Sequence, residues 1–269
     1  MPVMYQEKNR PMSCRCIVFI ILSTMSTSQD WDESVTTIHK MLSFIDTDLR
    51  KRGVKKDTTT TKLVFPAIRI GAHALVRVRK RFPNITHLDL GKVVKHGDIM
   101  TECAGGLLQF VLPYNSKMTD AGFHCLVRRQ HTLEMIELVN CSFLTNISIQ
   151  LIVSQCKQLK QIKLIKCKWV DRHTVKLLCR VPSDTLKRKR DESREVSKLE
   201  HIELTECDLL YSNGVQYLTH LRHTLEAINL TGCGMLDNQF AKYVSMCTGL
   251  VSVDMESTQV DDDGVYALT

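Results

Sequence analysis

The stretch Leu133-Glu-Met-Ile136-Glu-Leu138-Val-Asn-Cys141 decides the fold, because its pattern recurs along the chain. With Leu133 as position 1, apolar residues occupy positions 1, 4 and 6, and a cysteine occupies position 9. The same frame begins again at Leu159, Leu199 and Leu225, and ends each time in a cysteine, namely Cys167, Cys207 and Cys233. A pattern that returns at fixed positions is the signature of a repeat architecture.

Weaker copies of the frame flank these four and begin at Ile85, Leu107 and Leu250. The steps between successive starts are 22, 26, 26, 40, 26 and 25 residues. The long step contains a polar, highly charged segment, and we interpret residues 182–198 as a flexible loop inserted into an ordinary repeat. About seven repeats are therefore expected.

Each repeat carries the pattern of one strand followed by one helix. The alternation Ile136-Glu137-Leu138 is typical of a short strand with one buried face. Downstream, Ile147, Leu151 and Ile152 follow a helical spacing. One such unit cannot bury its apolar side chains alone, so neighbouring units must stack and supply the core. The sequence thus predicts an α/β solenoid, with short parallel strands on a concave face and helices on a convex face.

Over residues 82–269 the pattern resembles the leucine-rich repeat, and specifically its cysteine-containing subfamily. That subfamily also has a cysteine three residues before the next repeat, as in Cys156-Lys-Gln-Leu159 and Cys247-Thr-Gly-Leu250. Its turn into the helix is similar to Thr119-Asp120-Ala-Gly122 and Asp262-Asp263-Gly264. The resemblance implies a horseshoe-shaped leucine-rich-repeat domain that binds other proteins.

Cysteine is abundant, with 11 residues spread over most of the chain. A secreted disulfide framework is normally short and densely bridged, so this distribution indicates a reducing compartment. The position 9 cysteines are expected to fill buried turns next to a backbone carbonyl or amide. A metal site is the alternative, but cysteines in a row with about 5 Å between strands do not surround one point as zinc requires. We expect no metal and no cofactor.

The N-terminal third has a different character. Residues 1–29 are interpreted as a disordered or targeting extension, and residues 30–81 as a helical cap on the first repeat. In F-box proteins a short helical module precedes cysteine-containing repeats, and Met41-Leu-Ser-Phe-Ile-Asp46 resembles the interior of that module. The usual Leu-Pro opening is missing, so the module is either degenerate or absent. The resemblance implies that residues 30–81 bind the ubiquitin-ligase adaptor, and a plain cap is the alternative.

Composition excludes several classes of protein. The net charge of +7 is too small and too scattered to favour nucleic acid as the partner. The longest strongly apolar run covers residues 16–22, far short of the roughly 20 residues that span a bilayer. The chain is expected to be cytoplasmic, with a mitochondrial location as the alternative if the first residues are a transit peptide. A nuclear location is a further alternative, since the insertion contains the basic cluster Lys187, Arg188, Lys189 and Arg190.

No catalytic motif occurs in the sequence, which contains no phosphate-binding loop, no His-Glu-x-x-His and no Gly-x-Ser-x-Gly. We therefore predict that the chain is not an enzyme. The ten histidines are scattered, and none has a carboxylate or cysteine at a catalytic spacing.

A binding surface is predicted where positions 3, 5 and 7 of each strand project away from the core. In the middle repeats these positions are unusually apolar, and an exposed apolar patch with a polar rim marks an interaction site. We predict a protein partner on this concave face, either the substrate of an SCF-type ubiquitin ligase or, as the alternative, a neighbouring subunit in a ciliary or mitochondrial assembly. The predicted contact residues are Val111, Pro113, Met135, Glu137, Val139, Gln161, Lys163, Ile165, His201 and Glu203.

Overall fold

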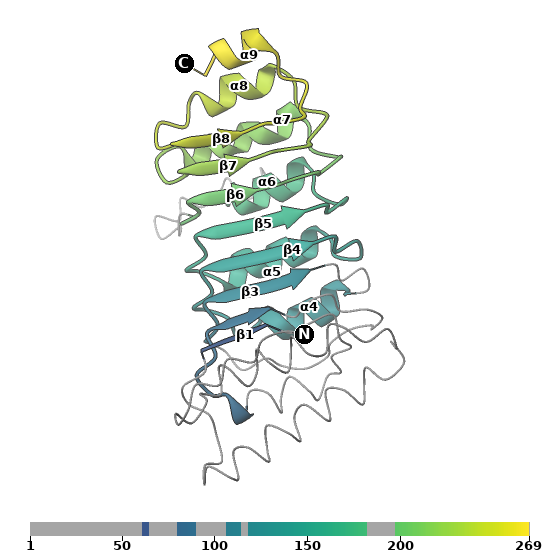
Figure 1. Ribbon diagram of the computed structural model, residues 1–269, viewed down its shortest axis with the longest axis vertical. Coiled ribbons are helices and arrows are strands. Elements are labelled where there is room, and N and C mark those ends of the chain that lie inside the picture. Colours follow the sequence, from purple (N-terminus) through teal and green to yellow (C-terminus); the bar gives the residue numbers. More distant parts are fainter. Residues whose placement is uncertain (1–60, 65–79, 90–105, 114–117, 182–196, 269) are drawn as a thin grey trace, which may run out of the picture.

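The computed structural model describes residues 61–64, 80–89, 106–113, 118–181 and 197–268 (Figure 1). The predictions for residues 1–60, which include the extension and most of the F-box-like region, lie outside the described residues. The same holds for residues 182–196 of the insertion and for its basic cluster.

A single sheet of eight parallel strands runs through the described part of the chain, in the order β1 to β8. Parallel strands need crossover connections, and the helices that follow the strands provide them on one face of the sheet (Figure 1). The strands are β1 (Lys62–Val64), β2 (His87–Asp89), β3 (Gln109–Pro113), β4 (Met135–Val139), β5 (Gln161–Ile165), β6 (His201–Glu203), β7 (Ala227–Asn229) and β8 (Ser252–Asp254).

Short helices form the second layer and pack in chain order on the neighbouring helix. They are α4 (Asp120–Val127), α5 (Asn146–Gln155), α6 (Arg172–Leu178), α7 (Ser212–Val215), the 3₁₀ helix η4 (Gln216–Leu221), α8 (Gln239–Val244) and α9 (Asp262–Tyr266). The predicted α/β class with parallel strands is confirmed, and the arrangement is compatible with a solenoid.

The predicted frame coincides with the register of the sheet. Residues at the same frame position face each other on adjacent strands, as Ile136 faces Ile162 and Ile162 faces Ile202. The position 4 and position 6 side chains of these repeats are at most 2% exposed. They join one continuous apolar core with the buried side chains of the helices.

The sheet begins one strand earlier than the repeat frame predicted. Lys62–Val64 forms β1 and pairs in parallel with β2, inside the region that we interpreted as a helical cap. Leu63 is buried and packs in the core at the register of Leu88. The missed signal is a period of 25 residues: with Thr60 as position 1, Leu63 falls on position 4, but a threonine at position 1 conceals the copy.

The position 9 cysteines form what we call the cysteine ladder. Cys141, Cys167, Cys207 and Cys233 are at most 1% exposed. Each thiol donates to the carbonyl oxygen of the position 6 leucine in the preceding repeat, with Sγ to O distances of 3.6, 3.5, 3.4 and 2.8 Å in chain order. The prediction that these thiols fill turns beside a backbone carbonyl is confirmed. Burial also raises the pKa of the Cys167 thiol to about 11, so it stays protonated and able to donate.

Position 8, just before the cysteine, has a left-handed backbone in five successive repeats. Its φ angles are 51° at Asn140, 56° at Lys166, 52° at Glu206, 74° at Gly232 and 58° at Ser257. Only glycine, and to a lesser extent asparagine, adopts this conformation at little cost. At Lys166, Glu206 and Ser257 the turn geometry is therefore imposed by the stacking of the repeats and not by residue preference.

A second row of polar contacts joins the N-termini of the helices. The Asp120 carboxylate accepts hydrogen bonds from the backbone and hydroxyl of Thr145, with distances of 3.0 and 2.7 Å. One repeat further, Asn146 donates to Asp171 over 3.1 Å, and Asp171 caps α6 by accepting from its first turn. Asn238 and Asp261 repeat this contact between the last two helices at 2.7 Å. These bonds hold in place the ends of the loops that lead into α5, α6 and α9.

We predict that Cys167→Ala lowers the free energy of unfolding by about 1 to 2 kcal/mol, because it removes a buried group and leaves the Leu138 carbonyl without its thiol donor. Urea unfolding of the purified protein measures the change. Cys125→Ala is the matched control, since Cys125 is partly exposed and lies outside the ladder, and it should cost less than about 0.5 kcal/mol. Equal losses for the two variants would contradict a stabilising role of the ladder.

Candidate partner-binding face

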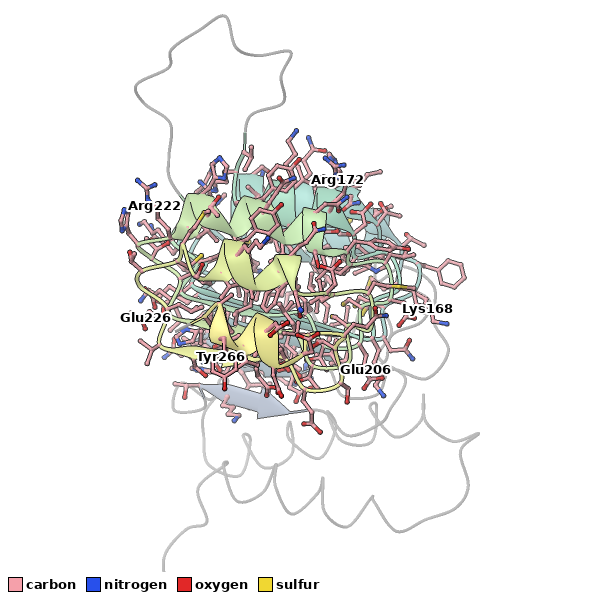
Figure 2. All side chains as sticks on the ribbon, turned by 90° about the horizontal axis from the view of Figure 1, so that it is seen from above. Lys168, Arg172, Glu206, Arg222, Glu226 and Tyr266 are labelled. Carbon is pink, nitrogen blue, oxygen red and sulfur yellow. The ribbon has the colours of Figure 1, made fainter. Side chains whose placement is uncertain are left out.

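The face of the sheet opposite the described helices is the candidate site, and we call it the open face. Figure 2 looks along the sheet and shows the helices together on one side of the strands. Positions 3 and 5 of each strand alternate with the buried position 4, which places them on the open face. Position 7 continues this alternation in β4 and β5.

Because the strands are in register, each frame position forms a row across the open face. The position 5 row contains Asp89, Val111, Glu137, Lys163, Glu203, Asn229 and Asp254. The position 3 row contains Lys62, His87, Gln109, Met135, Gln161, His201, Ala227 and Ser252. The structure thus brings the predicted residues onto neighbouring strands of one surface, with β3 to β6 at its centre.

The apolar part of the open face is smaller than predicted. Val111, Met135 and Ile165 are half-buried and lie on it as expected. Val139 was predicted to be exposed, and this is wrong: only 6% of it is accessible. It sits in register between Pro113 and Ile165, so neighbouring strands flank it on both sides, yet it does not join the core cluster on the helix side. The side chain of Pro113 lies outside the described residues.

An ion pair borders this apolar part. The Lys163 ammonium lies 3.0 Å from the Glu203 carboxylate, and the two side chains are 28% and 23% exposed. Gln161 and His201 are half-buried beside them in the position 3 row. A half-buried pair of this kind loses less to solvent than a fully exposed one, and it remains accessible to a partner.

Glu137 is the perturbed group of the open face. Partial burial raises the pKa of its carboxyl, the neighbouring Lys163 lowers it, and the charges of Glu203 and Asp89 raise it again. The net direction is upward. The influence of Asp89 was not predicted, because the copy of the frame that begins at Ile85 is the most degenerate one.

Outside the apolar part, the open face becomes polar toward the C-terminal strands. The Thr231 hydroxyl donates to Asp254 over 2.9 Å, and Thr205 lies within 3.5 Å of Asn229. Among the described residues, no group of three or more His, Cys, Asp or Glu side chains is arranged to hold a metal ion. The open face therefore combines apolar, charged and hydrogen-bonding side chains, a combination that is typical of surfaces that bind other molecules.

Two further findings concern the chain as a whole. No helix in the described ranges is long and apolar enough to cross a membrane. No protein-family model matches the chain, and it has no significant match among curated proteins.

The raised pKa of Glu137 predicts a pH-dependent stability. An acid whose folded pKa lies above its unfolded value destabilises the fold when ionised, and this cost disappears as the pH falls through the folded pKa. Glu137→Gln should therefore raise Tm at pH 7 by about 1 to 2 °C, a small gain because solvent screens a half-buried carboxylate. Thermal melts at pH 7 and pH 4 measure the difference, which should shrink at the lower pH.

Glu203→Gln is the control for this pair of melts. It removes the carboxylate that pairs with Lys163, so it should not stabilise the protein at pH 7. A Glu137→Gln variant that melts at or below the wild-type temperature at pH 7 would contradict the assigned cost.

Proposed function

We propose that this chain is a non-catalytic protein-interaction solenoid of the leucine-rich-repeat kind, and that it binds a protein partner through the open face. The observation that carries the proposal is that half-buried Val111, Met135 and Ile165 lie on β3, β4 and β5, on the same face as the Lys163 and Glu203 ion pair between β5 and β6. Sequence frame and strand register support the leucine-rich-repeat assignment.

The chemistry of the open face is that of a protein interface. Apolar side chains that keep part of their surface in water gain free energy when a partner covers them, about 25 cal/mol for each Å² of apolar area. A polar surround then fixes orientation, as at the rims of interfaces between proteins. The ion pair adds specificity, because a partner that disturbs it without replacing its hydrogen bonds binds more weakly.

For the biological setting, we propose substrate recognition in an SCF-type ubiquitin ligase, with residues 30–81 as the segment that recruits the adaptor. This rests on the resemblance of Met41-Leu-Ser-Phe-Ile-Asp46 to the interior of an F-box. Purified protein mixed with purified adaptor and cullin tests it directly. A stable complex that is lost when residues 30–60 are deleted supports the setting, and no complex with the full chain excludes it.

We predict that Met135→Asp combined with Ile165→Asp abolishes capture of the partner, with at least a hundredfold loss of affinity, because the two charges replace half-buried apolar side chains on the central strands β4 and β5. Affinity purification identifies the bound protein, and rebinding of that protein in purified form measures the affinity. Val139 is left unchanged, since a charge at a buried position would unfold the strand.

Met246→Asp is the matched control, because Met246 is 56% exposed and follows helix α8 on the other side of the sheet. It should retain full capture. The thermal melts of both variants should stay within about 3 °C of wild type. Retained capture by a folded Met135→Asp, Ile165→Asp variant would show that the partner binds elsewhere.

A further inference from the structure

A row of exposed apolar side chains follows the loops that lead from the strands to the helices, and the open-face proposal does not use it. Position 11 of four successive repeats is Phe143, Trp169, Leu209 and Met235. Phe143, Leu209 and Met235 are 62%, 49% and 46% exposed, and Trp169 is partly buried. We call these four residues the loop row.

The fold does not require these side chains to be apolar. In each of the same loops the next residue, position 12, already inserts into the core: Leu144, Val170, Leu210 and Leu236 are at most 1% exposed. Position 10 is polar or small in all four loops, with Ser142, Lys168, Asp208 and Gly234. A second apolar residue is exposed in three of the four loops and partly buried at Trp169, and together they form an apolar stripe of the kind that marks an interaction site.

The loop row is continuous and ordered. Successive loops are joined by backbone hydrogen bonds at position 8, from Asn140 to Ile165 and from Lys166 to Thr205, both between 2.8 and 2.9 Å. The Trp169 indole nitrogen donates to the Cys141 carbonyl over 2.8 Å, which fixes the ring on the preceding loop. At the C-terminal end of the row, the Gln259 side-chain amide donates to the Gly234 carbonyl over 2.5 Å.

The dimensions of the loop row match those of an α-helix. Adjacent strands lie about 4.8 Å apart, so four repeats space their side chains over roughly 15 Å. A helix laid along the row presents side chains of one face every 5.4 Å, and about ten residues cover the same length. An amphipathic helix with apolar residues at i, i+3, i+7 and i+10 therefore fits one side chain against each loop.

The charge of the surrounding loops favours a bound helix of positive net charge. Among the described residues, the segments between strand ends and first helical turns carry nine carboxylates against three basic side chains, and Lys117, before α4, lies outside the described residues. The carboxylates belong to Asp120, Asp171, Glu206, Asp208, Asp237, Glu256, Asp261, Asp262 and Asp263, and the basic residues are Lys166, Lys168 and Arg172. Lys166 is itself paired with Glu206 at 3.1 Å. Figure 2 shows Lys168 and Glu206 on the same edge of the molecule, opposite Arg222 and Glu226.

We propose that the loop row is a second binding site, and that it takes a basic amphipathic helix of a protein partner. The apolar face of the helix packs on Phe143, Trp169, Leu209 and Met235. Its lysines and arginines lie toward Asp208 and Asp237, both exposed beside the C-terminal half of the row. This site is independent of the open face, because it lies on the loops at one edge of the sheet.

Trp169 reports binding directly. The chain has two tryptophans, so Trp31→Phe leaves Trp169 as the single source of tryptophan fluorescence. The probes are three 18-residue peptides: an amphipathic Leu/Lys helix, a scrambled peptide of the same composition, and a Leu/Glu helix with reversed charge. The Leu/Lys helix should shift Trp169 emission to shorter wavelength and bind with a micromolar Kd, at least tenfold tighter than the other two peptides.

Two sets of variants test the contacts in that background. Leu209→Ser with Met235→Ser should weaken binding of the Leu/Lys helix at least tenfold. The control Met246→Ser with Val251→Ser removes two apolar side chains elsewhere that are more exposed, and it should have no effect. Asp208→Lys with Asp237→Lys should weaken the Leu/Lys helix and strengthen the Leu/Glu helix.

Three outcomes would overturn the proposal. The first is that the Leu/Lys helix does not shift the Trp169 emission, and the second is that the Leu/Lys and Leu/Glu helices bind with equal affinity. The third is that sedimentation shows the protein to self-associate, and that the Leu209→Ser, Met235→Ser variant no longer does. The last would identify a second copy of this chain as the occupant. Met135→Asp with Ile165→Asp should leave peptide binding unchanged, so failure at the open face and failure at the loop row are distinguishable.

Discussion

The structure depends on one constraint, which is that no repeat buries its own apolar side chains. A three- to five-residue strand and a helix of one to three turns expose most of their surface when alone. Burial comes from the neighbours on both sides, and the C-terminal end of the sheet shows it. Ile136 and Ile162 in the middle are 0% exposed, whereas Val253 in the edge strand β8 is only partly buried and the adjacent Val251 is 87% exposed.

Because burial comes from neighbours, register must be exact from repeat to repeat, and two rows of polar contacts hold it. The cysteine ladder ties the end of each strand to the carbonyl of the strand before it. The bonds from Asn146 to Asp171 and from Asn238 to Asp261 do the same at the helix N-termini. Directly before the cysteine ladder, the chain adopts a left-handed backbone conformation even at Lys166 and Glu206, two residue types that disfavour it.

Sequence periodicity was sufficient for the strands and the core, because burial in a stack acts on positions 4, 6 and 9 in every repeat. It was not sufficient for β1, since Thr60 stands at position 1 of that copy, where the frame expects a leucine. It also misjudged Val139, because alternation predicts which face a side chain is on but not how closely the neighbouring strands surround it. The loop row was missed for a related reason: four apolar residues at position 11 look like core residues until Leu144 and Leu210 are seen to fill that role.

The same constraint separates the residues that maintain the fold from the residues that are free to serve binding. Stacking restricts positions 4, 6, 9 and 12 to side chains that can be buried, and they are buried in successive repeats. It places no such demand on positions 3, 5 and 11, which keep contact with solvent and vary from Met135 to His201 and from Phe143 to Leu209. Met135 at position 3 is half-buried on the open face, and Phe143 and Leu209 at position 11 are exposed on the loops, so the core does not account for these apolar side chains. Recognition by a partner is the role that we propose for them, since exposed apolar patches mark interaction sites.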